Sequence, residues 1–340
     1  MPEIKQTLLA NYKATPEQEL QLMISNLLGD ELLAVEEILL DFTVSETGAM
    51  QELIFSVVQN KGKRLRPLLV LLSGGNVSGA RDDLRRTAAA VELIHTASLL
   101  HDDVIDGAGE RRGKPSLNAR YGNCPAVLAG DYLFARAFEM VALCENYPLI
   151  HLFTKAISTM CEGEIEQSRN AFNCNTSENQ YLRCAYSKTA VLLEACCEAG
   201  GLLSNLDRHA IQQLKQFGRN LGMAFQITDD LLDIWGDPLS TGKPSGSDLR
   251  EGTITLPLVY VLKDPRWGDR LRNLISRREF TPEALAFLTD PVCQNGPLTK
   301  AKQRATAYAA DAKESLLTFA PTPEREILEK LATYVLHRNK

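Results

Sequence analysis

The stretch that decides the fold is residues 17–40, which read EQELQLMISNLLGDELLAVEEILL. Its apolar residues recur every three or four positions and form one helical stripe, made of Leu20, Met23, Ile24, Leu27, Leu28, Leu32, Leu33, Val35, Ile38 and Leu39. The same spacing predicts helices over 48–59, 66–74, 81–105, 124–145, 148–171, 178–204, 208–235, 254–263, 265–276, 281–289, 297–318 and 322–337. No segment alternates with a period of two between hairpin turns. We therefore expect an all-α fold.

The organisation of the chain favours one domain. Residues 191–203 (VLLEACCEAGGLL) are apolar on more than one face, which predicts a central helix rather than a surface one. Residues 236–246 (GDPLSTGKPSG) are punctuated by glycine and proline, but they join helices and not domains. We expect residues 1–340 to form a single large helical bundle.

The charge and the cysteines exclude several classes of protein. The 340 residues include 37 Lys and Arg against 43 Asp and Glu, for a net charge of −6, which argues against a general nucleic-acid binder. There is no uncharged apolar run of about 18 residues and no apolar leader, so we expect a cytoplasmic protein without a membrane span. The eight cysteines lack metal-ligand spacing and are interpreted as reduced thiols used as small core residues.

Two acidic triples carry the candidate chemistry. Residues 102–106 (DDVID) and 229–233 (DDLLD) both match D-D-x-x-D and both end an apolar helical run. In a helix the three carboxylates fall within an arc of about 100°. They repel one another, and the helix dipole disfavours negative charge at a C-terminus. One such triple could be a solvated helix end, but two favour a hard cation such as Mg²⁺, which binds through carboxylates and substrate phosphates.

Basic clusters accompany the acidic ones. Residues 62–67 (GKRLRP) place three cations before a helix expected to begin near Pro67, and a helix N-terminus favours an anion such as diphosphate. Residues 111–114 (RRGK) follow the first triple closely. Surface charge compensation is the alternative interpretation. A diphosphate held by Arg and Lys on one side and by Mg²⁺ on the other accounts for both kinds of cluster.

Individual polar residues share these faces. His95 lies two helical turns before Asp102 and about 20° off its face, and Gln226 lies one turn before Asp229. Lys188 and Thr189 stand at the start of the expected central helix, and Lys243 lies in the loop after the second triple, where it could fold over a phosphate. Each of these residues also fits an ordinary surface, core or helix-end position.

These segments together resemble a known family. GKRLRP, ELIHTASLLHDDVIDGAGERRGKPS, AGDYLFARA, YSKTAVLLE, GMAFQITDDLLDIWGD and TGKPSGSDLREGTITLPLVY occur in order between about residues 60 and 260 and resemble the trans-isoprenyl diphosphate synthase (polyprenyl synthetase) family, long-chain bacterial members of the heptaprenyl type included. The resemblance implies an all-α bundle around a deep central cavity, with the two triples facing each other at its mouth. It also implies a transferase that condenses isopentenyl diphosphate head-to-tail onto an allylic diphosphate.

The resemblance also assigns roles to single residues. It implies an isopentenyl diphosphate site formed by Lys63, Arg66, His95 and Arg112, and an allylic diphosphate site formed by Arg111, Lys188, Thr189, Gln226 and Lys243. It implies three Mg²⁺ ions with substrate bound, held by Asp102, Asp103, Asp106, Asp229, Asp230 and Asp233; together with Lys188 these are the expected catalytic residues. Thr253 departs from the lysine of many relatives, and we expect it to weaken the grip on diphosphate without removing activity.

The resemblance also leads to an expectation for the length of the product. The resemblance implies that the positions four and five before the first aspartate limit the chain, and here they are the small residues Ser98 and Ala97. We therefore expect a C30–C50 product grown from a farnesyl or geranylgeranyl primer, which would fit a quinone side chain. A C15–C20 synthase and, less favoured, a class I terpene cyclase are the alternatives. The expected assembly is a homodimer, or a heterodimer with a small non-catalytic subunit.

Overall fold

The computed structural model describes residues 15–45, 47–58, 62–75, 79–111, 113–235, 246–290 and 293–337. Its helices are α2 (Pro16–Phe42), α3 (Gly48–Val58), α4 (Leu65–Gly74), α5 (Arg81–Ile105), α6 (Leu117–Tyr121), α7 (Asn123–Ala142), α8 (Tyr147–Arg169), α9 (Glu178–Ala185), the π-helical turn η1 (Tyr186–Ala190), α10 (Val191–Leu203), α11 (Arg208–Trp235), α13 (Ser247–Glu251), α14 (Leu256–Lys263), α15 (Gly268–Arg277), α16 (Pro282–Leu285), the 3₁₀ turn η2 (Ala286–Thr289), the π-helical turn η3 (Gln294–Leu298), α18 (Thr299–Ser315) and α19 (Pro323–Tyr334). The strands β1 (Glu110–Arg111) and β2 (Lys114–Pro115) form a short antiparallel hairpin.

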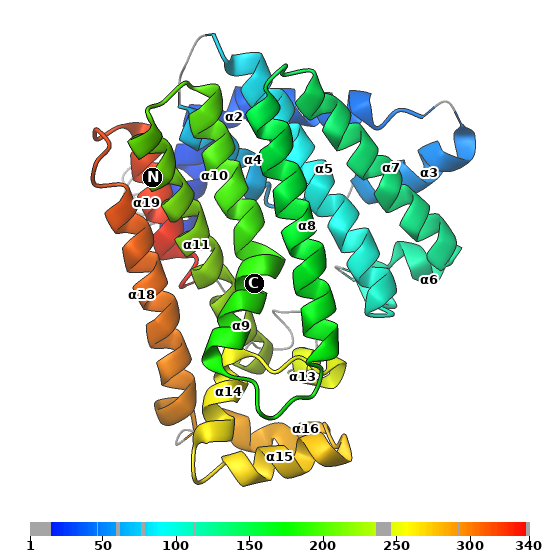
Figure 1. The fold of residues 1–340 in the computed structure, drawn as a ribbon, viewed down its shortest axis with the longest axis vertical. Helices are drawn as coiled ribbons and strands as arrows, with labels where there is room; N and C mark the ends of the chain where they lie inside the picture. Colours follow the sequence, from blue (N-terminus) through cyan, green and yellow to red (C-terminus); the bar gives the residue numbers. More distant parts are fainter. Residues whose placement is uncertain are drawn as a thin grey trace, which may run out of the picture.

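Several of the long helices run along the long axis of the molecule. Figure 1 shows α5, α8, α10, α11 and α18 extending along this axis, while α15 and α16 lie across its lower end. Helix α10 is the central helix, because almost every residue from Val191 to Leu203 is buried. The close packing of α10 against α4 depends on Gly200, where a Cβ atom would lie 2.6 Å from the carbonyl oxygen of Val70.

Helix α5 carries the first triple, and its sequence explains its direction. Asp82 and Asp83 lie in the first turn, where the helix dipole favours acidic residues. A run of small and branched apolar residues then packs into the core, so the helix is held along its length: Ala88, Ala89, Ala90, Val91, Leu93, Ile94 and Ala97. The helix ends at Ile105, inside the triple.

The all-α prediction is confirmed, and most helix positions agree with it. The expected bounds 81–105 and 208–235 match α5 and α11. The expected helix 178–204 is a nearly continuous run of α9, η1 and α10, interrupted by the π-helical turn. The prediction omitted the hairpin and the short helices α6 and α13, which are too brief to show a helical period.

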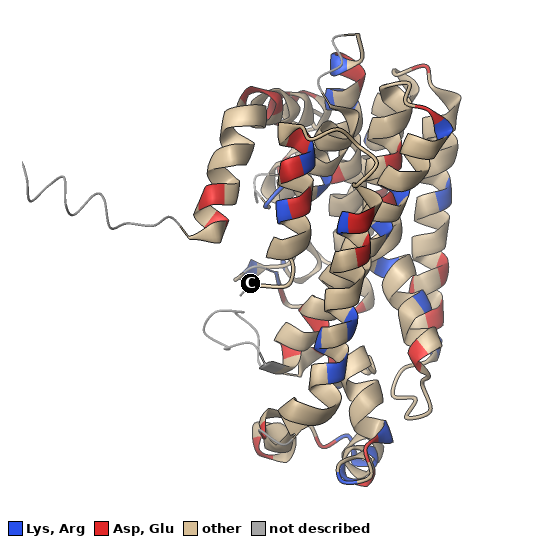
Figure 2. Ribbon diagram, turned by 90° about the vertical axis from the view of Figure 1, so that its left-hand side faces the viewer, with Lys and Arg blue, Asp and Glu red and all other residues tan. Residues whose placement is uncertain are grey.

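Two hydrophobic clusters hold the helices together. The larger includes α2, α4, α5, α7 and α10, and the smaller joins the end of α11 to α14, α15 and the start of α18. Tyr186 and Tyr308 pack against both clusters. In the view of Figure 2, Lys and Arg residues are interspersed with Asp and Glu residues along the helices.

The cysteines differ in how deeply they are buried. All eight cysteines are free thiols; Cys196, Cys197 and Cys293 are buried, whereas Cys124 and Cys161 are exposed. The interpretation of the cysteines as core residues is therefore wrong for those two, which lie at exposed positions of α7 and α8. Within the described residues, no helix combines the length and the apolar character needed to cross a bilayer.

Candidate active site

The middle carboxylate of the first triple faces the protein interior. Asp103 is only 2% exposed, whereas Asp102 is half-buried and Asp106 is exposed. Arg111 on the hairpin donates from Nε to Asp103 Oδ1 at 2.7 Å, and its Nη2 lies 2.6 Å from the same oxygen. At about 100° per residue the first and last aspartates stay within about 40° of each other, but the middle one turns away. The triple therefore divides into two outward carboxylates and one anchored carboxylate.

The middle carboxylate of the second triple is also buried, but here one of the two outer carboxylates is anchored as well. Asp230 is 2% exposed, accepts a hydrogen bond from the Tyr181 hydroxyl at 2.5 Å and another from Gln226 Nε2 at 2.7 Å. Asp229 is exposed. Asp233 accepts hydrogen bonds from the backbone and side chain of Ser247 at 3.0 and 2.5 Å, and so anchors the start of α13. The three carboxylates of each triple therefore differ in burial and in their hydrogen-bond partners.

The π-helical turn η1 places Lys188 and Thr189 beside both triples. It lies against glycines on both of its neighbours: a Cβ at Gly222 of α11 would lie 2.5 Å from Ala190 Cα, and a Cβ at Gly163 of α8 would collide with Ser187. This close approach lets the Thr189 hydroxyl donate to Gln226 Oε1. π-Helical turns inside α-helices occur frequently at functional sites.

Lys188 is the cation at the centre of the acidic groups. Its ammonium lies 3.6 Å from Glu164 Oε2 of α8. Burial lowers the pKa of Lys188, but the negative charges of Glu164, Asp102, Asp106 and Asp248 more than compensate, so that its pKa is raised. Asp102 and Asp106 come from α5, and Asp248 from α13 beside the second triple. Both acidic regions therefore converge on one lysine.

Burial and mutual repulsion raise the pKa of two of the six aspartates. Burial raises the pKa of Asp102 to about 6, with Lys188 opposing the shift and Glu164 adding to it. Burial likewise raises the pKa of Asp230 to about 7, although the hydrogen bonds from Tyr181 and Gln226 act to lower it. Carboxylates whose ionised form is disfavoured in this way gain most from a nearby cation.

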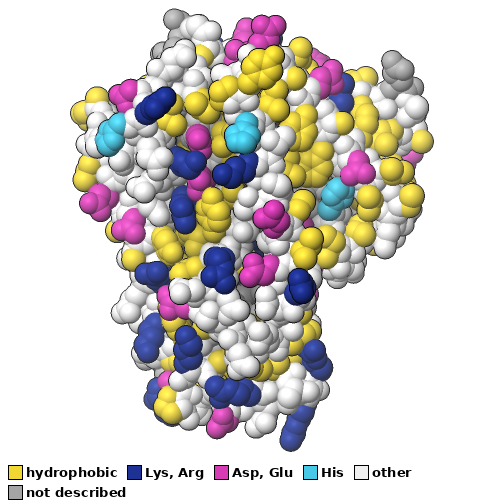
Figure 3. Space-filling view, in the orientation of Figure 1, with side chains coloured by type: hydrophobic (Ala, Val, Ile, Leu, Met, Phe, Trp, Pro, Cys, Tyr) yellow, Lys and Arg dark blue, Asp and Glu magenta, His cyan; other side chains and the backbone are white. Residues whose placement is uncertain are grey.

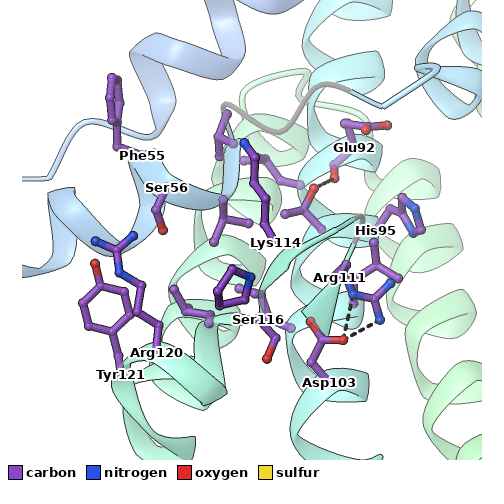
Figure 4. Close-up of a pocket in the computed structure, with 18 of the residues that line it drawn as sticks. Phe55, Ser56, Glu92, His95, Asp103, Arg111, Lys114, Ser116, Arg120 and Tyr121 are labelled. Atoms are coloured by element: carbon purple, nitrogen blue, oxygen red, sulfur yellow. Dashed lines mark hydrogen bonds and ion pairs between the residues drawn. The ribbon is translucent and has the colours of Figure 1, made fainter. Parts of the chain in front are cut away.

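A cavity of about 620 Å³ opens beside the first triple. Its lining includes His95 and Asp103 from α5, Arg111 and Lys114 from the hairpin, and Ser56 from α3. Figure 4 shows His95, Arg111 and Asp103 on one wall, with Lys114 extending across the space. A smaller cavity of about 130 Å³ is lined by Lys188, Gln226 and Asp230, among others. Thr253, which replaces the expected lysine, also lines this second cavity.

Several predicted site residues lie elsewhere or outside the described residues. Arg112 and Lys243 lie outside the described residues. Lys63 donates to the Tyr334 hydroxyl at 3.1 Å and does not line the cavity that holds His95. Arg66 lies in the first turn of α4, which begins at Leu65 rather than at Pro67.

The middle residue of the basic segment has a structural role. Arg64 has a positive φ of 51° at the start of α4 and pairs with Glu36 at 2.5 Å and Glu92 at 2.7 Å.

The two expected chain-length residues differ in burial. Ala97 is fully buried, whereas Ser98 is half-buried and donates to the carbonyl of His95.

Sequence reasoning missed three residues of the site. Glu164 interrupts an apolar helical stripe near the end of α8, which is a signal that could have identified it. Tyr181 and Asp248 gave no such signal, because their importance depends on contacts with Asp230 and Asp233 far away in the chain.

The donor set suits a hard cation. The groups on the outward faces are carboxylates, and oxygen ligands are those that Mg²⁺ prefers. Across the described residues, no three or more His, Cys, Asp or Glu side chains already surround one point as a metal site would require. This arrangement fits ions that are held partly by the phosphates of a substrate.

Several known proteins resemble this chain in sequence and in fold. The polyprenyl synthetase family model matches residues 48–290. The chain is 43% identical to heptaprenyl diphosphate synthase component 2 of Geobacillus stearothermophilus over 70% of this chain and 75% of that protein. It is 34% identical to octaprenyl diphosphate synthase of Escherichia coli K12 over 93% and 98% of the two chains. The crystal structure of a Caulobacter crescentus CB15 polyprenyl synthase, complexed with calcium and isoprenyl diphosphate, superimposes with a TM-score of 0.86 at 34% identity, over 94% of this chain and 98% of that one.

Proposed function

The chain belongs to the polyprenyl synthetase family and is a prenyltransferase, and we propose that it extends an allylic diphosphate with isopentenyl diphosphate to a long-chain all-trans product of C30–C50. The observation that carries the proposal is the position of Lys188, which lines one cavity with Asp230 of the second triple and interacts electrostatically with Asp102 and Asp106 of the first. A site that combines clustered carboxylates with a central cation is suited to a metal-bound diphosphate. The names of the similar proteins, which make heptaprenyl and octaprenyl chains, support the long product.

We propose that the outward aspartates hold Mg²⁺ and that the inward ones keep them in place. Asp102, Asp106 and Asp229 would supply direct ligands, and Asp233 could join them when its contact with Ser247 opens. Asp103 and Asp230 would not bind the ions directly. Their hydrogen bonds and ion pair with Arg111, Tyr181 and Gln226 would keep the neighbouring aspartates in position. When bound, Mg²⁺ stabilises the negative charge that develops on the departing diphosphate. The expected number of three ions belongs to this proposal.

The chain's own residues then bind and orient the two substrates. Lys188, Thr189 and Gln226 lie together on the allylic side, where Lys188 stabilises the leaving diphosphate by charge. His95 faces the larger cavity, which would hold isopentenyl diphosphate. Arg111 lines the same cavity but belongs, in the proposal, to the allylic diphosphate site. Arg66, Lys63, Arg112 and Lys243 complete these sites in the proposal. Holding the isopentenyl double bond beside the allylic carbocation supplies much of the rate enhancement.

The small residue at position 98 supports growth of the chain beyond C20. Ser98 lies one turn before Asp102, is half-buried, and is within about 40° of the face of α5 that carries the outward aspartates. We propose that the growing chain passes over this small side chain, and that an aromatic residue at this position would block it. The competing interpretation is a C15–C20 synthase, and the product assay below distinguishes the two.

The assembly and the domain organisation are also proposals. We propose that residues 1–340 form one domain, because Tyr186 and Tyr308 pack against both hydrophobic clusters. Figure 3 shows hydrophobic side chains gathered over α7 and α8, where Val127, Leu128, Tyr147 and Ile165 are exposed. Such a surface favours burial against another subunit, which we propose is a second copy of this chain. The similarity to a component 2 keeps a different small subunit as the alternative.

The testing experiment is a product assay on the purified chain alone. The protein is incubated with Mg²⁺, labelled isopentenyl diphosphate and farnesyl or geranylgeranyl diphosphate, and the dephosphorylated products are sized. Products of C30 or longer, absent with Asp102→Asn, support the proposal. A stop at C20 contradicts the chain length, and a cyclic hydrocarbon indicates a terpene cyclase. If the folded chain forms no product alone or with a small partner subunit, the proposed function is wrong.

A further inference from the structure

We infer that Tyr181 is a positioning residue for the metal and allylic diphosphate site, because its buried hydroxyl fixes the carboxylate of Asp230. This inference rests on the proposed function. Tyr181 lies on α9 and does not belong to either acidic triple or to any basic cluster. Its ring is 6% exposed, and its hydroxyl donates to Asp230 Oδ2 at 2.5 Å. The two residues are 49 positions apart in the chain.

Both oxygens of Asp230 are engaged, which fixes the orientation of the carboxylate. Tyr181 donates to Oδ2, and Gln226 Nε2 donates to Oδ1 at 2.7 Å. Gln226 Oε1 in turn accepts a hydrogen bond from the Thr189 hydroxyl. Because an amide has one acceptor side and one donor side, this chain of bonds also fixes which way the Gln226 amide faces.

Tyr181 and Thr189 secure the same segment at two points. They lie eight residues apart on the continuous run α9–η1, and each connects this run to α11 through Asp230 or Gln226. Lys188 lies between the two points. The hydrogen bond from Tyr181 therefore sets the spacing between the lysine that faces diphosphate and the helix that carries Asp229.

The role parallels that of Arg111 in the first triple. Each middle aspartate is 2% exposed and is held by a side chain from outside its own helix, Arg111 for Asp103 and Tyr181 for Asp230. Partners that orient metal-binding groups commonly contribute 10–100-fold to metal affinity or activity. We expect loss of the Tyr181 hydroxyl to act at the lower end of that range, because Gln226 still holds one oxygen.

The test compares Tyr181→Phe with Tyr260→Phe. The phenol of Tyr260 forms a hydrogen bond with Glu178, a carboxylate that lies on α9 but outside the triples. Each variant therefore removes one hydroxyl–carboxylate bond involving α9. Binding of Mn²⁺ in the presence of inorganic diphosphate is measured by electron paramagnetic resonance, together with Tm and steady-state constants for both substrates.

We expect Tyr181→Phe to weaken Mn²⁺ binding about tenfold and to raise KM for the allylic substrate, with KM for isopentenyl diphosphate unchanged. Tyr260→Phe should match the wild type in its affinity for Mn²⁺ and in its KM for each of the two substrates. Unchanged Mn²⁺ affinity in Tyr181→Phe, or an equal loss in both variants, overturns the inference. Wild-type protein that binds Mn²⁺ and diphosphate but transfers no prenyl group contradicts the proposed function instead.

A double variant keeps the inference testable if Tyr181→Phe does not fold. Tyr181→Phe combined with Asp230→Asn leaves no buried carboxylate without its donor, which removes the main reason for instability. If Tyr181 acts through Asp230, the double variant binds Mn²⁺ as strongly as Asp230→Asn alone. A further loss of more than threefold shows that Tyr181 acts by another route, and overturns the inference.

Discussion

Arg111 and Asp103 form an ion pair in which two guanidinium nitrogens contact one carboxylate oxygen, at 2.7 and 2.6 Å. Asp103 is almost completely buried, while Arg111 is about one-third exposed. The pair connects the end of α5 to the hairpin β1–β2, so a residue that sequence similarity assigns to substrate binding also holds the first triple in place.

Removing the guanidinium should destabilise the fold through the charge left behind. We expect Arg111→Ala to lower the free energy of unfolding by about 2 kcal/mol, because a buried carboxylate loses its partner. Arg111→Ala combined with Asp103→Asn should recover most of that loss, since no buried charge remains. Urea unfolding followed by circular dichroism measures both. An Arg111→Ala variant as stable as the wild type would show that water replaces the guanidinium without cost.

The raised pKa of Asp102 predicts a pH-dependent stability in metal-free buffer. Its pKa is 3.8 in the unfolded chain and about 6 in the fold. Below pH 3.8 both states are protonated, and the contribution to stability is lost as the pH rises through 6, where the folded state must release its proton. We expect Asp102→Asn to be more stable than the wild type by on the order of 3 kcal/mol at pH 7.5, with most of that difference gone at pH 4.

Catalytic activity should rise with pH over the range in which the stability of the metal-free protein falls. Since the ionised form of Asp102 is the one that would hold a metal in the proposed site, kcat/KM should fall as the pH drops below about 6. Asp102→Asn should be inactive at every pH despite its greater stability. Thermal unfolding between pH 4 and 8, with and without Mg²⁺ and diphosphate, checks the stability half of the prediction. A variant less stable than the wild type at pH 7.5 would contradict it.

Glu164 should set the acid limit of the reaction. Its negative charge raises the pKa of Asp102, and its carboxylate lies 3.6 Å from the Lys188 ammonium. Glu164→Gln should therefore move the acid limb of the pH–rate profile to lower pH and raise KM for the allylic substrate a few-fold, because Lys188 loses an orienting partner. Glu162→Gln, at an exposed position of the same helix, is the matched control. Identical profiles for the two variants would remove Glu164 from the site.

The sequence predicts the features of this site that depend on neighbouring residues in the chain, but not those that depend on contacts between distant segments. Helical periodicity predicted the bounds of α5 and α11, since apolar spacing is a local property. The spacing of about 100° per residue could not show that Asp103 and Asp230 turn inward. That distinction depends on Arg111 and Tyr181, which approach from other elements.

The π-helical turn could not be predicted for the same reason. The run 178–204 looks like one uninterrupted helix in sequence, whereas the turn packs closely against Gly163 and Gly222 of two neighbouring helices, which are distant in the chain. Sequence similarity implies roles for Lys188 and Thr189, but it could not show that both residues lie on a π-helical turn.

The product length should depend on Ser98 and much less cleanly on Ala97. Ser98 is half-buried and lies about 40° off the face of Asp102, so an aromatic ring at position 98 can occupy the path of a growing chain. We expect Ser98→Phe to shorten the main product to C15–C20 while Tm stays within a few degrees of the wild type. Ala97 is fully buried in the core, so Ala97→Phe should instead cost about 1–3 kcal/mol of stability by overpacking. Sizing the products of both variants by thin-layer chromatography, beside urea unfolding, separates the two effects. A stable Ser98→Phe enzyme that still makes C30 or longer chains would show that the chain grows along a different face of α5.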